Sequence, residues 1–426
     1  MMMLNRILTF VFFLGMAPLK AEESYLNLQP YSGPHVKGVD TSTLKGKAMT
    51  GYQGWFNCEG DGANLGWTHW TRNRHRPFGP SNVTVDLWPD ISEYTTEELF
   101  ESEFRLQDGS HAKVFSSFKR DTVLRHYRWM REYGIDGAFV QRFANGLHNP
   151  SIMNHKNAVL THSREGANRN GRAYAVMYDL SGLPAGGVKH VIEDWKMLRN
   201  QMQIGLDSGY LKHKGQPLVA VWGIGFNDGR KYTLAECKAL IEFLKADGCS
   251  VMVGIPSFWR ELKRDALNNP NLHEILKLAD VISPWTPGRY RNPTEASRHG
   301  QEVWAKDIQW CQKHDLDYLP VVFPGFSWHH LNKEAPLDQI PRLKGQFLWS
   351  QFTAAKKAGA EMIYVAMFDE VDEATAIFKC TNEPPVGDEP FLTYEGLSTD
   401  HYLWLTGEAG RMLRGDRPAT MKIPIR

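Results

Sequence analysis

The chain has 426 residues, of which 42% are hydrophobic and 23% charged, which is the composition of a folded globular protein and excludes a disordered one. Its 49 Lys and Arg residues almost balance its 48 Asp and Glu residues. The resulting net charge of +1 leaves no strong field to attract nucleic acid or an anionic membrane, so neither partner is expected.

The first 21 residues have the pattern of a secretory signal peptide. One Arg precedes an apolar run from Ile7 to Met16, and Ala21 provides a small residue near the expected cleavage site. The run is too short to span a bilayer. We therefore expect an exported protein, periplasmic or extracellular, without membrane insertion, in which residues 22–44 form an N-terminal extension.

Eight apolar runs follow, separated by stretches of helical periodicity. The runs span residues 48–56, 136–143, 173–179, 217–223, 250–256, 280–285, 318–325 and 361–370. They are apolar almost throughout, as is typical of parallel strands covered on both faces. The stretches between them predict helices over residues 121–133, 151–163, 188–203, 233–246, 271–278, 293–314 and 341–358.

This alternation predicts a (β/α)8 barrel of the TIM type over residues 45–380. A doubly wound sheet would show a Gly-rich phosphate-binding turn, and neither GxGxxG nor GxxxxGK[ST] occurs. The long loop over residues 57–120 contains one further strand candidate, residues 113–118. Long loops at the carboxyl ends of barrel strands usually shape a site. Residues 381–426, with a helical pattern over 400–414, are expected to pack on the barrel as a C-terminal extension.

The predicted strand ends and the long loop carry many polar and aromatic residues. The carboxyl ends of barrel strands point into the active-site mouth, and aromatic rings pack against the C–H faces of sugars. As an alternative, some of these aromatic residues pack in the hydrophobic core and do not contact a ligand. The candidate substrate-binding residues are Tyr52, Trp55, Trp67, His69, Arg142, Tyr178, Asp179, Trp222, Trp285, Trp328 and His329.

The cysteines and histidines do not have the spacing of a metal site. The five cysteines form no CxxC or Cys/His zinc pattern, and the histidines form no HxxxH pair. No metal and no cofactor are therefore expected. The sequence leaves open whether one or two disulfides form.

Glu370 and Glu373 are the candidate catalytic residues. If the chain curls into a helical turn after the last strand, their Cβ atoms lie about 5–6 Å apart. Retaining glycosidases use carboxyl pairs roughly 5–5.5 Å apart. At such a distance the ionisation of one group raises the pKa of the other, so that one group stays protonated. The alternative is that this segment is the solvated N-terminus of a helix, where the helix macrodipole favours acidic residues.

These segments resemble a known enzyme family. GYQGWF at 51–56, GWTHW at 66–70, the Tyr-Asp pair at 178–179 and the E-x-x-E-A-T segment at 370–375 are similar to glycoside hydrolase family 99 endo-α-mannosidases and family 71/99-like proteins. The resemblance implies a barrel of retaining enzymes that use no metal and cleave α-mannosidic bonds within a chain. It implies that Glu370 deprotonates the substrate's 2-hydroxyl, which attacks the anomeric carbon to give a 1,2-anhydro sugar, and that Glu373 is the general acid/base.

The segment at the last strand departs from the family pattern. The family reads Asn-Glu-Trp-His-Glu-Gly-Thr, and this chain has Asp369, Val371 and Asp372 at the Asn, Trp and His positions. Additional acidic groups are expected to raise the pKa of both glutamates. The expected function is a secreted glycoside hydrolase acting on an α-linked oligo- or polysaccharide, with α-mannan as the family's substrate class. The alternatives are a direct-nucleophile retaining glycosidase on another polysaccharide and a non-catalytic carbohydrate-binding barrel.

Overall fold

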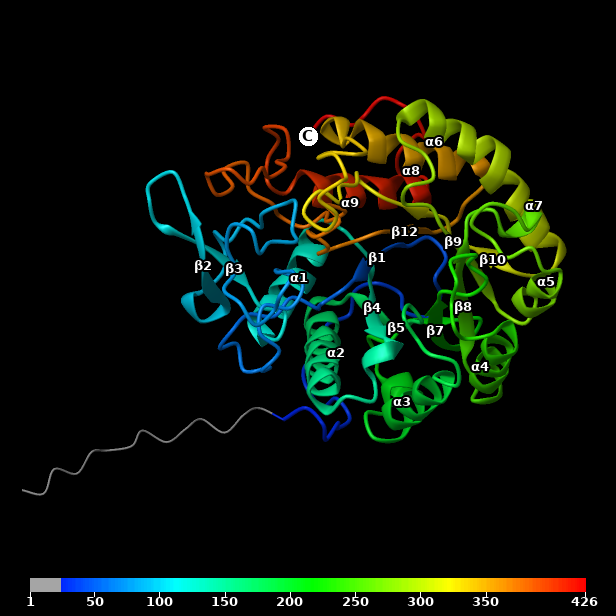
Figure 1. The fold of residues 1–426 in the computed structure, drawn as a ribbon. Helices are drawn as coiled ribbons and strands as arrows, with labels where there is room; N and C mark the ends of the chain where they lie inside the picture. Colours follow the sequence, from blue (N-terminus) through cyan, green and yellow to red (C-terminus); the bar gives the residue numbers. More distant parts are fainter. Residues whose placement is uncertain (1–23) are drawn as a thin grey trace, which may run out of the picture.

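The structure, a computed structural model, describes residues 24–426 and contains a closed parallel β-barrel (Figure 1). The predicted signal peptide, residues 1–21, lies outside the described residues. Parallel pairing runs in the order β9, β8, β7, β5, β4, β1, β12. The strands are β1 (Ala48–Tyr52), β4 (Gly137–Phe143), β5 (Ala173–Asp179), β7 (Gln216–Trp222), β8 (Ser250–Pro256), β9 (Val281–Trp285) and β12 (Ile363–Val365).

Two short strands close the barrel. β10 (Asp317–Tyr318) pairs with β9, and β11 (Val321–Val322) pairs with β12, both in parallel. They are two pieces of one barrel position, interrupted at Leu319 and Pro320, where proline has no N–H to donate to a ladder. The (β/α)8 barrel prediction is therefore confirmed.

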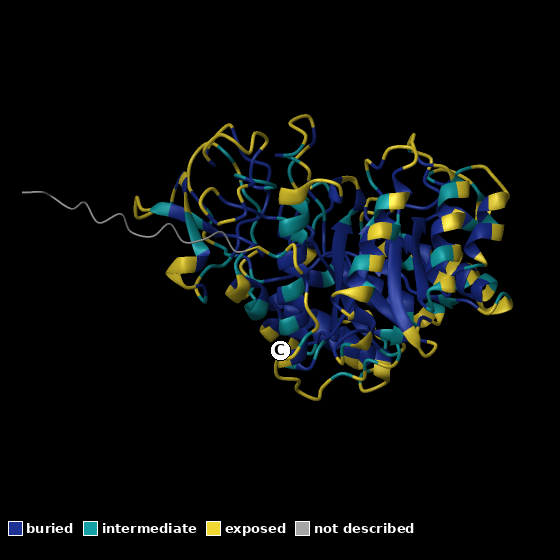
Figure 2. Ribbon diagram, turned by 90° about the horizontal axis from the view of Figure 1, so that it is seen from below, coloured by how far each residue is buried: buried dark blue, intermediate teal, exposed yellow. Residues whose placement is uncertain are grey.

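Helices cover the outside of the barrel, and the strands inside it are almost fully buried (Figures 1 and 2). The described helices are α1 (Arg120–Glu132), α2 (Pro150–Asn170), α3 (Val188–Asn200), α4 (Leu234–Ala246), α5 (Asn271–Leu276), α6 (Pro293–His299), α7 (Ala305–Lys313), α8 (Gln346–Ala358) and α9 (His401–Arg414). A π-helical turn, Gly300–Trp304, joins α6 to α7, so the helix predicted over 293–314 is one stretch with an irregular centre.

The loop after β1 leaves the barrel and returns to it. Within it, β2 (Leu99–Arg105) and β3 (His111–Phe115) form an antiparallel hairpin, which corresponds to the extra strand predicted there. β6 (Lys212–His213) adds a short antiparallel pairing to β7.

The C-terminal segment packs on the barrel. In α9 most side chains are buried, and Arg414 forms an ion pair of 3.2 Å with Asp136, which precedes β4. The Trp349 indole on α8 donates a hydrogen bond of 2.9 Å to the carbonyl oxygen of Thr420. The last 26 residues are thus tied to α8 and to the residue that precedes β4.

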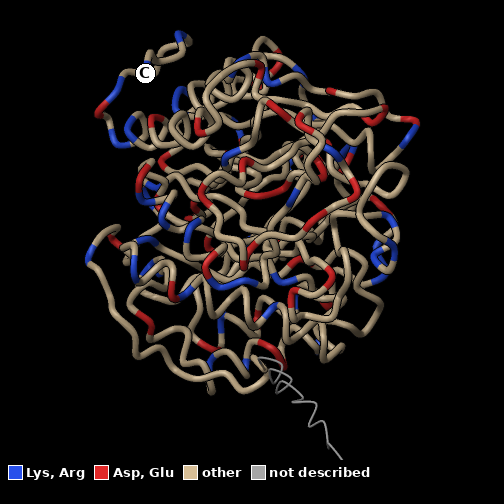
Figure 3. The backbone as a smooth tube through the Cα atoms, turned by 90° about the vertical axis from the view of Figure 1, so that its left-hand side faces the viewer, with Lys and Arg blue, Asp and Glu red and all other residues tan. Residues whose placement is uncertain are grey.

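Basic and acidic residues are interspersed over the side of the molecule seen in Figure 3. All five cysteines are buried free thiols. Among residues 24–426, no helix has both the length and the apolar character needed to cross a membrane.

Candidate active site

The segment after β12 folds back as a compact turn above the barrel. The Phe368 amide donates to the carbonyl oxygen of Gly51 at 2.7 Å, and the amides of Thr375 and Ala376 donate to the carbonyl oxygen of Glu370 at 3.0 and 2.9 Å. The strand predicted to run to residue 370 therefore ends at Val365. This turn brings both candidate glutamates to the mouth of the barrel.

Asp369 fastens this turn to the end of β1. Its two carboxylate oxygens accept hydrogen bonds of 2.8 Å from the backbone amides of Gln53 and Gly54. Gly54 has a φ of +56°, a left-handed conformation that glycine adopts at little cost. Burial raises the pKa of Asp369 to about 7, although both amides favour its charged form. Asp369 is thus a positioning residue that connects the first and last barrel strands.

Glu370 is buried and held at both carboxylate oxygens. Oε1 accepts a hydrogen bond of 2.8 Å from the side-chain amide of Gln53, and Oε2 accepts one of 2.8 Å from the Thr375 hydroxyl. Burial raises its pKa well above the usual range, and the charges of Glu373 and Asp372 raise it further. The two donors fix one orientation of the carboxyl group.

Glu373 is half-buried and its carboxyl group is less firmly held. Its backbone carbonyl accepts a hydrogen bond of 3.0 Å from the Ser327 amide. Burial raises its pKa to about 7, the charge of Asp372 adds to this, and a hydrogen bond with Trp328 acts in the opposite direction. A carboxyl group with this pKa exchanges its proton near neutral pH, which suits general acid/base work.

Both glutamates line one cavity of about 190 Å³, which we call the carboxylate cavity. It combines acidic groups, amides and aromatic rings, the lining expected of a site for a polar ring-shaped ligand. Its lining residues are Gln53, Trp55, Gln141, Phe143, Asp179, Ser181, Trp222, Trp285, Tyr364, Met367, Glu370 and Glu373.

Asp179 adds a third acidic group at the end of β5. Its carboxylate accepts a hydrogen bond of 2.7 Å from the Ser181 amide, and burial raises its pKa. Of the substrate-binding residues predicted from the sequence, Trp55, Asp179, Trp222 and Trp285 line the carboxylate cavity.

His69 lies beside the cavity through its contact with Trp55. The two rings stack with centroids 3.7 Å apart and planes 5° from parallel, and Nδ1 of His69 lies 3.0 Å from a carboxylate oxygen of Asp372. His69 lines a neighbouring cavity of about 380 Å³, which shares Trp55, Phe143 and Ser181 with the carboxylate cavity. Asp372 therefore orients His69, and His69 in turn supports Trp55.

Four predicted residues pack in the core and do not line the carboxylate cavity. Arg142 is fully buried and bonds Asp194 on α3, with Nε to Oδ2 at 2.9 Å, and the Tyr178 hydroxyl donates to the same Asp194 at 2.6 Å. The Tyr52 hydroxyl lies 2.9 Å from Nδ1 of His126, and Trp67 packs against Phe78. Two further predicted residues, in the loop after the seventh barrel strand, do not line the carboxylate cavity either. Trp328 is 41% exposed, and His329 forms hydrogen bonds with Asp86 and with the backbone of Ala335.

Strand alternation explains most of these differences. Successive residues of a strand point to opposite faces, so Gln141 points into the barrel and Arg142 outward to the helices. The lining residues that sequence reasoning missed are Gln53, Gln141, Phe143, Ser181, Tyr364 and Met367. Applying the two-residue period to each strand would have found Gln141 and offered Tyr364 within β12, whereas Met367 depends on the turn after β12.

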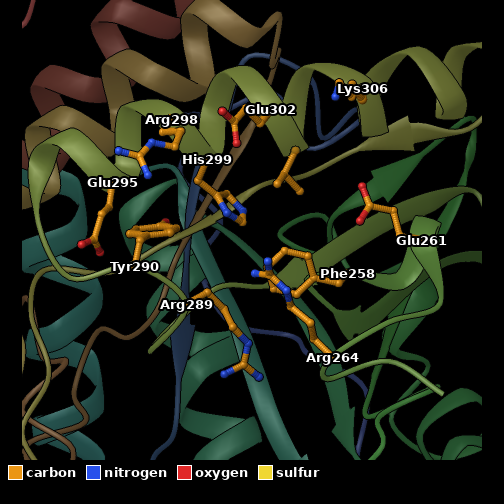
Figure 4. Close-up of a pocket in the computed structure, with 11 residues that line it drawn as sticks. Phe258, Glu261, Arg264, Arg289, Tyr290, Glu295, Arg298, His299, Glu302 and Lys306 are labelled. Atoms are coloured by element: carbon orange, nitrogen blue, oxygen red, sulfur yellow. The ribbon is translucent and has the colours of Figure 1, made fainter. Parts of the chain in front are cut away.

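A separate cavity of about 510 Å³ lies among the loops after β8 and β9 and the α6 to α7 stretch (Figure 4). His299 extends from that helical stretch toward Tyr290 and Phe258, whereas Arg298, Glu302 and Lys306 lie along the stretch itself (Figure 4). None of the predicted site residues lines it. Within residues 24–426, no cluster of three or more His, Cys, Asp or Glu side chains is arranged to hold a metal ion.

Comparison with known proteins relates the fold to one enzyme family. The chain is similar to a structure of the GH99 endo-α-mannosidase from Bacteroides thetaiotaomicron, with 16% identity, a TM-score of 0.63, and coverage of 88% of this chain and 99% of that one. A structure of this endo-α-mannosidase with bis-tris-propane gives 17% identity, a TM-score of 0.62 and the same coverage. No protein-family model and no curated protein matched the sequence. The resemblance noted in the sequence is therefore confirmed for the fold.

Proposed function

We propose that this protein is an exported glycoside hydrolase that cleaves an α-linked glycan with retention of configuration. The observation that carries the proposal is the carboxylate cavity, in which Glu370 and Glu373, delivered by one turn, share an aromatic-walled space. The similarity to the fold of an endo-α-mannosidase supports an α-mannan-type substrate. The signal-peptide pattern of residues 1–21 supports export.

The hydrogen bonds divide the roles between the two glutamates. Glu370 accepts bonds from an amide and a hydroxyl, which oppose the rise in its pKa caused by burial and by its acidic neighbours, and so favour the carboxylate form that a base needs. Glu373, with a pKa of about 7, is the group that can hold a proton near neutral pH and give it to the leaving oxygen. Because the two interact, one proton shared by the pair is the reactive state.

In the proposed reaction Glu370 removes the proton from the substrate's 2-hydroxyl. That oxygen attacks the anomeric carbon, and the glycosidic bond breaks as Glu373 protonates the departing oxygen. Glu373 then takes a proton from water, the water oxygen opens the 1,2-anhydro ring at the anomeric carbon, and Glu370 returns its proton to O2. Two inversions at one carbon give net retention.

The test is release of reducing ends from a panel of α-glycans by the full chain and by two variants. Glu373→Gln should lose about 10²–10⁴-fold on natural glycans but retain activity on an aryl glycoside, whose leaving group needs no proton. Glu370→Gln should impair both substrates, because the attacking oxygen must lose its proton whatever leaves. Glu302→Gln, in the separate cavity of Figure 4, is the matched control and should behave as the parent.

Two outcomes would count against the proposal. Hydrolysis unaffected by Glu373→Gln would exclude this residue as the acid, and binding of glycans without any hydrolysis would favour the carbohydrate-binding alternative. A 2-O-methyl substrate separates the two chemical routes. Its normal cleavage would leave a direct attack by a glutamate as the mechanism, with a covalent glycosyl-enzyme ester.

A further inference from the structure

The cavity that adjoins the carboxylate cavity differs from it in charge. We call it the cationic cavity. Lys156 and Arg74 line it, and none of the described residues that line it is Asp or Glu. His155 also lines it, but burial lowers the pKa of this imidazole to about 4, so it is uncharged near neutral pH. Lys156 and Arg74 are therefore its basic groups, and burial lowers the pKa of Lys156 to about 7, so its ammonium form is only partly populated near neutral pH until an anion enters.

Lys156 has an unusual environment for an ammonium group. It belongs to α2, and its Nζ lies 5.4 Å from the centroid of the Phe143 ring, with no hydrogen bond or ion pair to the described residues. The nearby Arg142 and Asp194 are already bonded to each other. A partly buried ammonium without a paired anion is costly, and an entering anion would relieve that cost.

A second donor also lacks a partner. The indole Nε1 of Trp55 is buried and makes no hydrogen bond, and Trp55 lines both cavities. The indole N–H can only donate, so it too requires an acceptor oxygen. Arg74 is exposed at the rim, where it adds a long-range attraction for negative charge.

The two cavities are close enough for one ligand to enter both. Both cavities are lined by Trp55, Phe143 and Ser181. Lys156 in one and Asp179 in the other lie near enough that each shifts the pKa of the other. We propose that the cationic cavity binds an anionic oxygen group, a carboxylate or a sulfate ester, carried by the glycan whose sugar ring occupies the carboxylate cavity. This inference rests on the proposed function and narrows its substrate class to acidic α-glycans.

The separate cavity of Figure 4 provides the contrast. Its arginines and lysine are interspersed with Glu261, Glu295 and Glu302, so it offers no single sign of charge (Figure 4). Lys306 in that cavity is an exposed lysine and a suitable control position.

The test measures binding to the inactive full-length Glu373→Gln protein by calorimetry. The probes are α-linked mannose and glucose disaccharides, each in neutral form, with one C6 oxidised to a carboxylate, and with one 6-O-sulfate. We expect an anionic form to bind at least about 10-fold more tightly than its neutral counterpart, because a charge-assisted bond replaces an unpaired ammonium. The carboxylate and sulfate arms identify which group the cavity selects.

Adding Lys156→Met to this background should abolish the preference while leaving the affinity for the neutral disaccharide unchanged, which also shows that the variant is folded. Lys306→Met should leave the preference intact, and added salt should weaken it in the parent. Equal binding of neutral and anionic forms, binding of neither, or a preference that survives Lys156→Met would overturn the inference. Failure of the proposed function would instead appear as hydrolysis that is insensitive to Glu373→Gln, which this binding test does not involve.

Discussion

Asp372 shows how one acidic side chain changes the chemistry of its neighbours. It lies between Glu370 and Glu373 in the turn, and its Oδ1 is buried without a hydrogen bond. Its charge raises the pKa of both glutamates, as the sequence led us to expect from the extra acidic residues. The same carboxylate orients His69 and so supports Trp55, which sequence alone does not reveal because residues 69 and 372 are far apart in the chain.

The raised pKa of Glu373 predicts the pH dependence of hydrolysis. The protonated form is required, so kcat/KM should fall about 10-fold per pH unit above a pKa of about 7. At low pH the rate should fall again when Glu370 is protonated. The apparent pKa values of the acidic and the alkaline limb of this pH profile are properties of the interacting pair of glutamates. The measurement is kcat/KM on a natural-type glycan from pH 4 to 9.

Two variants test whether ionisation of Glu373 causes the decrease in kcat/KM at high pH. Asp372→Asn should move it to lower pH, because one charge that disfavours ionisation of Glu373 is removed. Glu373→Gln on an aryl glycoside should lack this limb. A rate that stays constant up to pH 9 in the parent would contradict the assignment of Glu373 as the acid.

At the scale of elements, the sequence predicted the strands better than the direction of their side chains. The runs over 173–179 and 250–256 coincide with β5 and β8, because residues buried on both faces give a continuous apolar signal. The same continuity hides which residues face the barrel interior. Arg142 was therefore predicted to bind substrate, whereas it packs outward against α3. The end of β12 was also missed, since the bend after Val365 is set by bonds to β1.

The buried Arg142 and Asp194 pair predicts a stability effect without a direct binding effect. Arg142→Met would leave the Asp194 carboxylate buried and uncompensated, which typically costs about 3–5 kcal/mol of the free energy of unfolding. Urea denaturation measures this cost. Arg128→Met, which removes a half-exposed ion pair with Glu93, is the control and should cost less than about 1 kcal/mol.

The double variant Arg142→Met with Asp194→Leu should recover part of the lost stability, because no unpaired charge remains. An Arg142→Met protein with parental stability and weakened glycan binding would show instead that Arg142 acts on substrate.

At the scale of the whole molecule, the C-terminal helix α9 meets the barrel through a close backbone contact with the end of α1. α9 passes directly over the end of α1, and a Cβ atom placed on Gly407 would lie 1.8 Å from the carbonyl oxygen of Tyr133. Only a residue without a Cβ permits this approach. The helical pattern over 400–414 was visible in the sequence, but its docking surface was not, because close packing of a glycine leaves no hydrophobic signal.

Two glycines of α9 give opposite predictions for the same substitution. In an isolated helix, Gly→Ala stabilises by about 0.8–1.0 kcal/mol. Gly410→Ala should approach that gain, because its new Cβ would meet only the flexible side chain of Arg414, at 3.2 Å. Gly407→Ala should instead destabilise by about 1–3 kcal/mol or more, since the clash is with backbone and α9 must shift from α1. Urea midpoints of the two variants, measured beside the parent, decide the point. If Gly407→Ala were as stable as Gly410→Ala, the helix would not be docked on the barrel at this distance, and the C-terminal segment would contribute to folding through its other contacts, with α8 and with Asp136.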